Sequence, residues 1–136
     1  MTANDDELQR VTSHLAELGV QFRIGKSGKV RAASVPADIA LSSDAWQRLC
    51  QLPHLARLEA AGCADVSDQH AQWISSLPQL AQLDLSHTSI TDACIPALER
   101  MQQLQLLNLT GTGISRDALA GLRKRMLNTR IVHLTA

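Results

Sequence analysis

Aromatic residues are almost missing from this 136-residue chain: they make up 2 % of it, and tyrosine is absent. The core must therefore be aliphatic and built mainly from leucine. Long apolar runs are missing too, since none approaches the ~18 residues that a helix needs to span a bilayer. The N-terminus, MTANDDELQRV, is polar and acidic and does not resemble a signal peptide. With 45 % apolar and 19 % charged residues, the sequence predicts a soluble globular protein.

A strong charge of one sign is also lacking, because thirteen basic and thirteen acidic side chains give a formal net charge of zero. This balance argues against a general electrostatic field for nucleic acid or an anionic membrane. The three cysteines, Cys50, Cys63 and Cys94, are an odd number and form no CxxC pair. We interpret them as small buried hydrophobes in a reducing compartment, not as a disulfide framework. The sequence therefore predicts a cytoplasmic protein with no membrane or nucleic-acid partner.

What the sequence does contain is a repeat. In LPQLAQLDL the leucines Leu77, Leu80, Leu83 and Leu85 are spaced three, three and two apart, which fits neither one amphipathic helix nor one strand. The pattern returns 24 residues further on, and every apolar position has a match. The matched pairs are Leu77/Met101, Leu80/Leu104, Leu83/Leu107, Leu85/Leu109, Thr88/Thr112, Ile90/Ile114, Ile95/Leu119 and Leu98/Leu122.

Three weaker copies flank this pair. The preceding copy has Leu52, Leu55, Leu58, Ala60, Cys63, Val66, Ala71 and Ile74, with one extra residue near Ala64 and Asp65. A fainter copy before it has Val30, Ala33, Val35, Trp46 and Leu49. A partial copy after the pair has Met126, Thr129, Val132 and Leu134.

The pattern resembles the leucine-rich repeat family, whose unit is L-x-x-L-x-L-x-x-N/C/T-x-L. The match covers residues 52–136, with a weaker match over 30–51, and the T-x-I-T-D form at 88–92 is similar to a subclass common in bacterial proteins. The resemblance implies an α/β fold: a right-handed, ribonuclease-inhibitor-like solenoid with a parallel β-sheet on the concave face and helices on the convex face. It divides one domain into an N-terminal cap (1–29), a degenerate repeat (30–51), three repeats (52–76, 77–100, 101–125) and a terminal half-repeat (126–136).

The cap and the unit each have local signals. Helical spacing of Leu8, Val11, Leu15 and Leu18 predicts a helix that starts at Asn4 or Asp5 and ends at Gly19. A strand over 20–24, a turn at GKSG (25–28) and a strand from Val30 predict a hairpin. Within the units we expect the Thr88 and Thr112 hydroxyls to bond backbone groups in the turn, with Cys63 at the same place. The residues expected at helix starts are Ser67, Asp68, Thr91, Asp92 and Ser115. The helix pairs expected to be buried are Trp46/Leu49, Ala71/Ile74, Ile95/Leu98 and Leu119/Leu122.

Outward-facing strand residues should form columns on the concave face. One predicted column is Ser34, Glu59, Asp84, Asn108 and His133, and a second is Ala32, Arg57, Gln82, Leu106 and Ile131. The candidate partner-binding residues are Arg57, Glu59, Gln82, Asp84, Ser86, His87, Leu106, Asn108, Thr110 and His133. The family resemblance implies that this face binds another protein without catalysis.

The last strand raises an alternative. Nothing in the sequence follows it to cover its edge, so Ile131, Val132, His133 and Leu134 could pair with a second copy. The protein would then be a self-assembling structural protein or a homodimer; otherwise the short edge stays solvated. A third alternative, an inhibitor or adaptor that regulates an enzyme, also follows from the resemblance.

The sequence contains no strong signal for a catalytic, metal or phosphate-binding site. Glu59 and Asp84 should be neighbours, but an open sheet offers no pocket to separate their pKa values, so we expect a mildly acidic patch that favours a basic partner. The five histidines lack metal-ligand spacing, no cysteine has a local base, and GKSGK (25–29) lacks the phosphate-loop pattern. We therefore expect no enzyme activity, no metal and no cofactor.

A basic cluster lies near the C-terminus, at Arg116, Arg123, Lys124, Arg125 and Arg130. Positive charge is favoured near the C-terminus of a helix, so this cluster is expected to be a solvated face. The alternative is an acidic partner, including the segment 5–7 of another copy.

Overall fold

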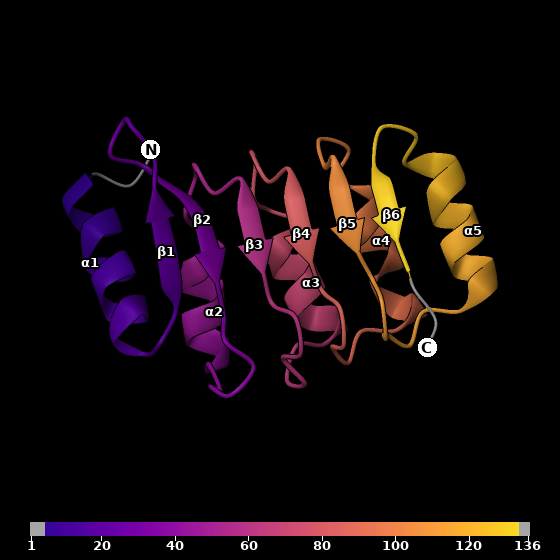
Figure 1. Ribbon diagram of the computed structural model, residues 1–136, viewed down its shortest axis with the longest axis horizontal. Helices are drawn as coiled ribbons and strands as arrows, with labels where there is room; N and C mark the ends of the chain where they lie inside the picture. Colours follow the sequence, from indigo (N-terminus) through magenta and orange to yellow (C-terminus); the bar gives the residue numbers. More distant parts are fainter. Residues whose placement is uncertain (1–4, 134–136) are drawn as a thin grey trace.

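The computed structural model describes residues 5–133 and shows a mixed α/β fold on one six-stranded sheet (Figure 1). The strands are β1 (Gln21–Ile24), β2 (Val30–Ser34), β3 (Arg57–Glu59), β4 (Gln82–Asp84), β5 (Leu106–Asn108) and β6 (Arg130–Val132). They lie side by side in chain order. β1 is antiparallel to β2, and every other pair is parallel. The predicted α/β class and the N-terminal hairpin are confirmed.

The first helix precedes β1, and each of the other helices connects two neighbouring parallel strands. The helices are α1 (Asp5–Glu17), α2 (Ser43–Leu49), α3 (Asp68–Ile74), α4 (Ile95–Glu99) and α5 (Arg116–Arg125), and a 3₁₀ turn, η1 (Asp92–Cys94), precedes α4. In Figure 1, α2, α3 and α4 lie behind the sheet, whereas α1 and α5 lie at its two ends. One face of the sheet is therefore covered by helices, and the other face is open.

The core lies between the sheet and the helices. The central residues of three neighbouring strands, Leu58, Leu83 and Leu107, are buried in register with one another. All the helix residues predicted to be inside are buried: Trp46, Leu49, Ala71, Ile74, Ile95, Leu98, Leu119 and Leu122. Each unit, meaning a strand with its turn and the helix that follows, thus buries its apolar side against its neighbours.

Threonine hydroxyls fix the turns after two strands. Thr88 Oγ1 donates to the Leu85 carbonyl at 2.7 Å, and Thr112 Oγ1 donates to the Leu109 carbonyl at 2.7 Å. Both contacts were predicted. The Cys63 thiol occupies the same place in its unit but donates to the Val35 carbonyl of the preceding unit, at 3.3 Å.

The helix starts are tied to one another across the units. Ser67, Thr91 and Ser115 are helix caps, as predicted. The Asp68 carboxylate accepts from the Thr91 N–H and hydroxyl, both at 2.7 Å. In the same way Asp92 accepts from the Ser115 N–H at 2.7 Å and its hydroxyl at 2.8 Å. These two aspartate rungs join three successive units, and they end because Arg116 follows Ser115 where the earlier units have aspartate.

The N-terminal cap packs onto the first unit. α1 begins at Asp5 and places Leu15 in the core, where it is fully buried, and Val20 follows it there. The helix therefore covers the start of the core that β1 and β2 alone would leave exposed.

Candidate functional site

The uncovered side of the sheet carries most of the predicted site residues. We call the outward-facing residues of β3 to β6 the open face: Arg57, Glu59, Gln82, Asp84, Leu106, Asn108, Arg130 and Val132. Neighbouring strands in a sheet lie ~4.8 Å apart. The open face is therefore a short polar surface, and Leu106 is its largest exposed apolar side chain, with 36 % of its surface accessible.

The register of the strands corrects the prediction at β6. Arg57, Gln82 and Leu106 do form one column, but it continues to Arg130 and not to Ile131. Glu59, Asp84 and Asn108 form the other, but it continues to Val132 and not to His133. The prediction was wrong by one residue because the last unit has one residue fewer between Thr129 and Ile131 than the unit before it has at the same place.

The observed register of β6 places two of the predicted residues away from the open face. Ile131 lies opposite Leu107 and is buried on the helix side of the sheet. Side chains alternate along a strand, so His133 turns to the same side as Ile131. The His133 Nε2 atom is buried and has no hydrogen-bond partner among the described residues. Leu134, also predicted at this edge, lies outside the described residues.

Several open-face side chains hold the local structure. The Asp84 carboxylate accepts from the Ser86 N–H at 3.0 Å and from its hydroxyl at 2.6 Å. Asn108 Oδ1 accepts from the Thr110 N–H at 3.1 Å in the same way. Ser86 is only 6 % exposed, so it orients Asp84 and presents little surface to a partner.

The acidic side chains of the open face are accompanied by basic side chains, so the expected acidic patch does not form. Glu59 forms an ion pair with Arg57 on its own strand, and Arg130 adds a second basic side chain beyond Leu106. Glu59 and Asp84 are neighbours, as predicted, but they bond to different groups. The open face therefore carries two acidic and two basic side chains.

The turn after β4 projects His87 beside the open face. Its backbone is left-handed, with a φ of 56°, as is that of Gly111 in the next turn, with a φ of 73°. A left-handed backbone is uncommon for a residue other than glycine. The His87 N–H donates to the Thr110 carbonyl at 2.7 Å, and a Cβ atom on Gly111 would overlap the His87 ring. His87 is thus an exposed side chain whose ring lies over a glycine.

A hollow of ≈ 320 Å³ adjoins the open face at β1 to β3. It exists because Ala32 and Ser34, the outward residues of β2, are small and lie between larger side chains, Arg23 on β1 and Arg57 on β3. Ala32 and Ser34 were predicted in the columns of the sheet, but neither the hollow nor the role of Arg23 was predicted. Two small residues between long ones were the available signal.

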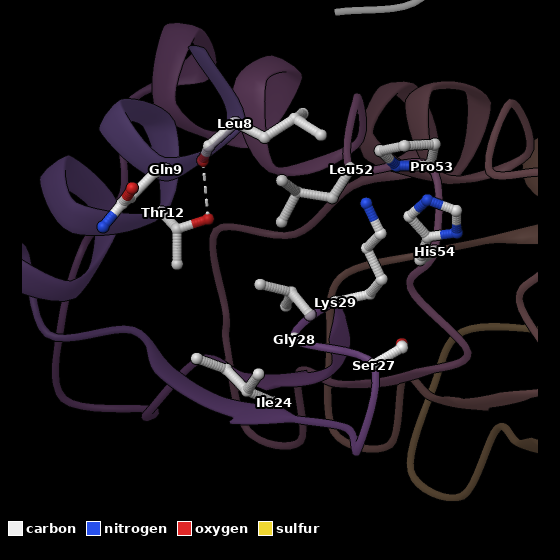
Figure 2. A pocket seen from close by; sticks show the side chains of 11 residues that line it. Leu8, Gln9, Thr12, Ile24, Ser27, Gly28, Lys29, Leu52, Pro53 and His54 are labelled. Atoms are coloured by element: carbon white, nitrogen blue, oxygen red, sulfur yellow. Dashed lines mark hydrogen bonds between the residues drawn. The ribbon is translucent and has the colours of Figure 1, made fainter. Parts of the chain in front are cut away.

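A second pocket lies away from the open face, under the N-terminal cap (Figure 2). It has a volume of ≈ 340 Å³ and is bounded by α1, the hairpin turn and the turn at 52–54. Its apolar wall includes Leu8, Ile24 and Leu52, and the Lys29 side chain extends toward His54. The Thr12 hydroxyl at this pocket donates to the Leu8 carbonyl at 2.8 Å.

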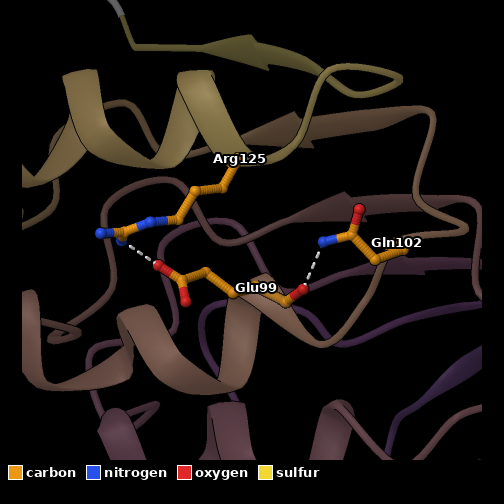
Figure 3. Close-up of polar contacts among 3 residues, drawn as sticks. All are labelled: Glu99, Gln102 and Arg125. Carbon is orange, nitrogen blue, oxygen red and sulfur yellow. Dashed lines mark hydrogen bonds and ion pairs between the residues drawn. The ribbon is translucent and has the colours of Figure 1, made fainter.

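The C-terminal edge of the sheet is less open than predicted. Arg123 of α5 donates from Nη2 to the Ile131 carbonyl at 3.3 Å. Arg125 at the end of the same helix forms an ion pair with Glu99 of α4 (Figure 3). Gln102 donates to the backbone carbonyl of Glu99, which is a local contact at the end of α4.

The cysteines have no features of reactive thiols, and the cysteines and histidines are not grouped as a metal site within the described residues. Burial raises the pKa of the Cys50 thiol to about 12 and that of Cys94 to about 12. Burial also raises the pKa of Cys63, and Asp65 adds to the effect. Thiols with raised pKa values are poor nucleophiles because little thiolate forms. Across residues 5–133 no three histidine, cysteine or carboxylate side chains are grouped to hold a metal ion.

His70 bonds the cap of α3 and contacts two tryptophan rings. Its Nδ1 atom accepts from the Ser67 N–H at 3.1 Å, and its ring meets Trp46 and Trp73 edge to face at centroid distances of 5.4 and 5.0 Å. Burial lowers the pKa of His70, against an opposing effect of Asp65. This histidine therefore acts as a neutral cap acceptor at the start of α3.

Comparisons with known proteins identify a fold. Within the part of the chain that is described, no helix has the length and apolar character to cross a membrane. No family model matches the chain, and no curated protein matches its sequence. Among solved structures it is similar to leiomodin-1 actin-binding site 2, with a TM-score of 0.61 and 14 % identity, over 96 % of this chain and 79 % of that one. The chain therefore shares the overall fold of that protein.

Proposed function

We infer that the chain is a leucine-rich repeat protein, a right-handed solenoid of the ribonuclease-inhibitor-like type, that binds another protein through its open face without catalysis. The 24-residue repeat, the regular burial of its apolar positions and the shared turn contacts support the family assignment. The similar structure is named as an actin-binding site of leiomodin-1. From that likeness the proposal takes a protein-binding role and not a particular partner.

The observation that carries the proposal is the surface formed by the open face and its hollow. Hydrogen bonds within the chain already fix Asp84 and Asn108, so binding would lose little side-chain entropy there. Leu106 lies in the middle of this surface and is an apolar anchor, and the hollow beside Arg57 has room for a side chain of the partner. Balanced charge favours a partner segment that is itself mixed in charge.

The test compares two exposed leucines. Leu106→Arg places a charge at the centre of the open face, whereas Leu18→Arg makes the same change near the end of α1, at a leucine that is 42 % exposed. Tagged wild type and both variants are used to capture proteins from native lysate, and circular dichroism confirms that all three are folded. A partner held by wild type and Leu18→Arg but lost by Leu106→Arg supports the proposal. Equal capture by all three proteins would contradict it.

An inhibitor or adaptor role would be a special case of this proposal, and the identity of the captured partner would distinguish it. Pairing of β6 between two copies is disfavoured because it would bring the basic residues of α5 and β6 in one copy against the same residues in the other. We therefore expect the isolated chain to be monomeric in light scattering.

A further inference from the structure

The edge strand β6 has backbone groups that point away from its neighbour β5 and are not paired with another strand in the described part of the chain. The Arg130 N–H donates to the Gln105 carbonyl at 2.8 Å, and the Val132 carbonyl accepts from the Leu109 N–H at 2.7 Å. Backbone groups alternate in direction along a strand, so the N–H and C=O of Ile131 point away from β5. Arg123 donates to this carbonyl through a flexible side chain. The Ile131 carbonyl at this edge is thus bonded to an arginine side chain that can move away.

The same end of the molecule concentrates positive charge. Residues 100–136 contain six basic and one acidic side chain, whereas residues 1–99 contain seven basic and twelve acidic ones. Helix α5 has three basic residues in its last turn, while α2 has one and α3 has none. Arg125 is paired with Glu99, which leaves Arg123, Lys124 and Arg130, which we call the basic end. The helix dipole favours the basic residues in the last turn of α5 but does not account for Arg130, which lies on β6.

We propose that the basic end, together with the β6 edge, binds an extended acidic segment of a partner protein as an added strand. The segment would donate and accept hydrogen bonds at the Ile131 backbone, in the manner of strand addition to a sheet edge. Arg123 would move from the Ile131 carbonyl to a carboxylate of the segment, because a charged acceptor binds guanidinium more strongly than a carbonyl does. Arg130 also belongs to the open face, whereas Arg123, Lys124 and the outward backbone groups of Ile131 lie outside it, so the proposal does not depend on the function proposed for that face.

Charge selects this occupant over the others. A second copy paired at β6 would bring two basic ends together, and like charges facing each other across strands are unfavourable. Residues 100–136 contain no aromatic side chain on which a nucleic acid base could stack. An acidic strand satisfies both the backbone edge and the three cations.

The test uses a fluorescent peptide of alternating glutamate and valine, titrated with the full chain and followed by anisotropy. Arg130→Glu should weaken binding by about tenfold, since it replaces a charge-assisted contact with a repulsive one. Lys26→Glu, a similar charge reversal at an exposed position in the hairpin turn, should leave affinity unchanged. Binding should also weaken as salt is added.

Backbone pairing is tested separately with the same peptide N-methylated at alternate residues. The methylated peptide should bind at least tenfold more weakly, and exchange of the Ile131 amide hydrogen should slow only with the unmodified peptide. Equal affinity for both peptides, or equal losses in Arg130→Glu and Lys26→Glu, would overturn the proposal. So would tighter binding of a single-stranded oligonucleotide or of anionic vesicles than of the peptide. Leu106→Arg adds a cation beside Arg130 and should not weaken binding of the acidic peptide, so failure here and failure of the open-face proposal are distinguishable.

Discussion

The two ends of the sheet are closed by different means. At the N-terminal end, α1 places Leu15 in the core, and β1 pairs with β2 over four positions. At the C-terminal end, α5 turns exposed basic side chains outward, and Arg123 covers a carbonyl of the last strand. The first closure is apolar, and the second is polar.

The difference shows two solutions to one problem. A stack of units leaves apolar surface at both ends, and burial of that surface stabilises in proportion to its area. The N-terminal cap is stabilised directly by this burial of apolar surface. At the C-terminal end the Arg123 side chain instead bonds the Ile131 carbonyl of the edge strand. This contact limits pairing of the edge with strands of other chains. Stability should therefore depend on the first end more than on the second.

The largest expected effect tests this asymmetry by truncating one core residue at each end. Leu15→Ala should lower the free energy of unfolding by about 2–5 kcal/mol, since the side chain is fully buried. Ile131→Ala should lose less, about 2 kcal/mol, because Ile131 is 9 % exposed and lies on an edge strand. Urea unfolding measures both. A larger loss at Ile131 would reverse the comparison.

A smaller effect compares one turn from each half of the chain. Gly28 in the hairpin and Gly111 after β5 are both left-handed, and alanine in that conformation loses about 1–2 kcal/mol. A Cβ atom at Gly28 has open space around it, whereas at Gly111 it meets the His87 ring. Gly111→Ala should therefore destabilise more than Gly28→Ala in thermal unfolding. In a His87→Ala background the two losses should become similar; a persistent gap would exclude the ring as its cause.

Next is a pH effect at the start of α3, away from either end of the sheet. Burial lowers the pKa of His70 in the folded chain below its ordinary value of 6.5, so the unfolded chain binds the proton more readily. The stability that neutral His70 contributes is present above pH 6.5 and is lost as the pH falls through the folded pKa.

The matched control for that effect is His70→Gln. Glutamine at this cap position also accepts from the N–H of the cap residue but does not titrate. Urea unfolding across this pH range should show a smaller loss on acidification in His70→Gln than in wild type. Identical pH profiles would assign the acid sensitivity to other groups.

The smallest expected effect concerns one ion pair near each end. Glu99 and Arg125 join α4 to α5, and Asp44 and Arg48 pair within α2. Both pairs are partly exposed, so double-mutant cycles to alanine should give coupling energies of about 0.2–1 kcal/mol that shrink in salt. The Glu99–Arg125 coupling should be the larger, because Glu99 is the least exposed of the four. A stronger Asp44–Arg48 coupling would contradict this ranking, and a Glu99–Arg125 coupling of zero would show that the contact does not hold α4 to α5.

Much of the fold was predictable because the units obey a fixed period. Position 83 and position 107 carry leucine, both are buried, and both are central in their strands. The cap residues Ser67, Thr91 and Ser115 were also predictable, since their side chains have a direct role at helix starts. Local chemistry repeated at a regular spacing is the kind of signal that a single sequence carries well.

The last strand and the candidate site were less predictable. Leu134 and Val132 are apolar and invite an alignment that places Val132 inside, but the structure buries Ile131 and turns His133 inward. The prediction failed because the last unit is one residue shorter before its strand, which moves the buried position from Val132 to Ile131. The hollow beside Arg57 was missed because it depends on side chains from three strands at once.

The aspartate rungs have a consequence for the length to which such a protein could be engineered. A copy of residues 77–100 inserted after Arg100 would keep every rung, since Asp92 would hold the Thr91 of the copy and the aspartate of the copy would hold Ser115. The same copy appended beyond α5 would meet Arg116, which offers no acceptor for its threonine. Insertion before Arg116 therefore continues the aspartate rungs, whereas a copy appended beyond α5 lacks the rung at Arg116.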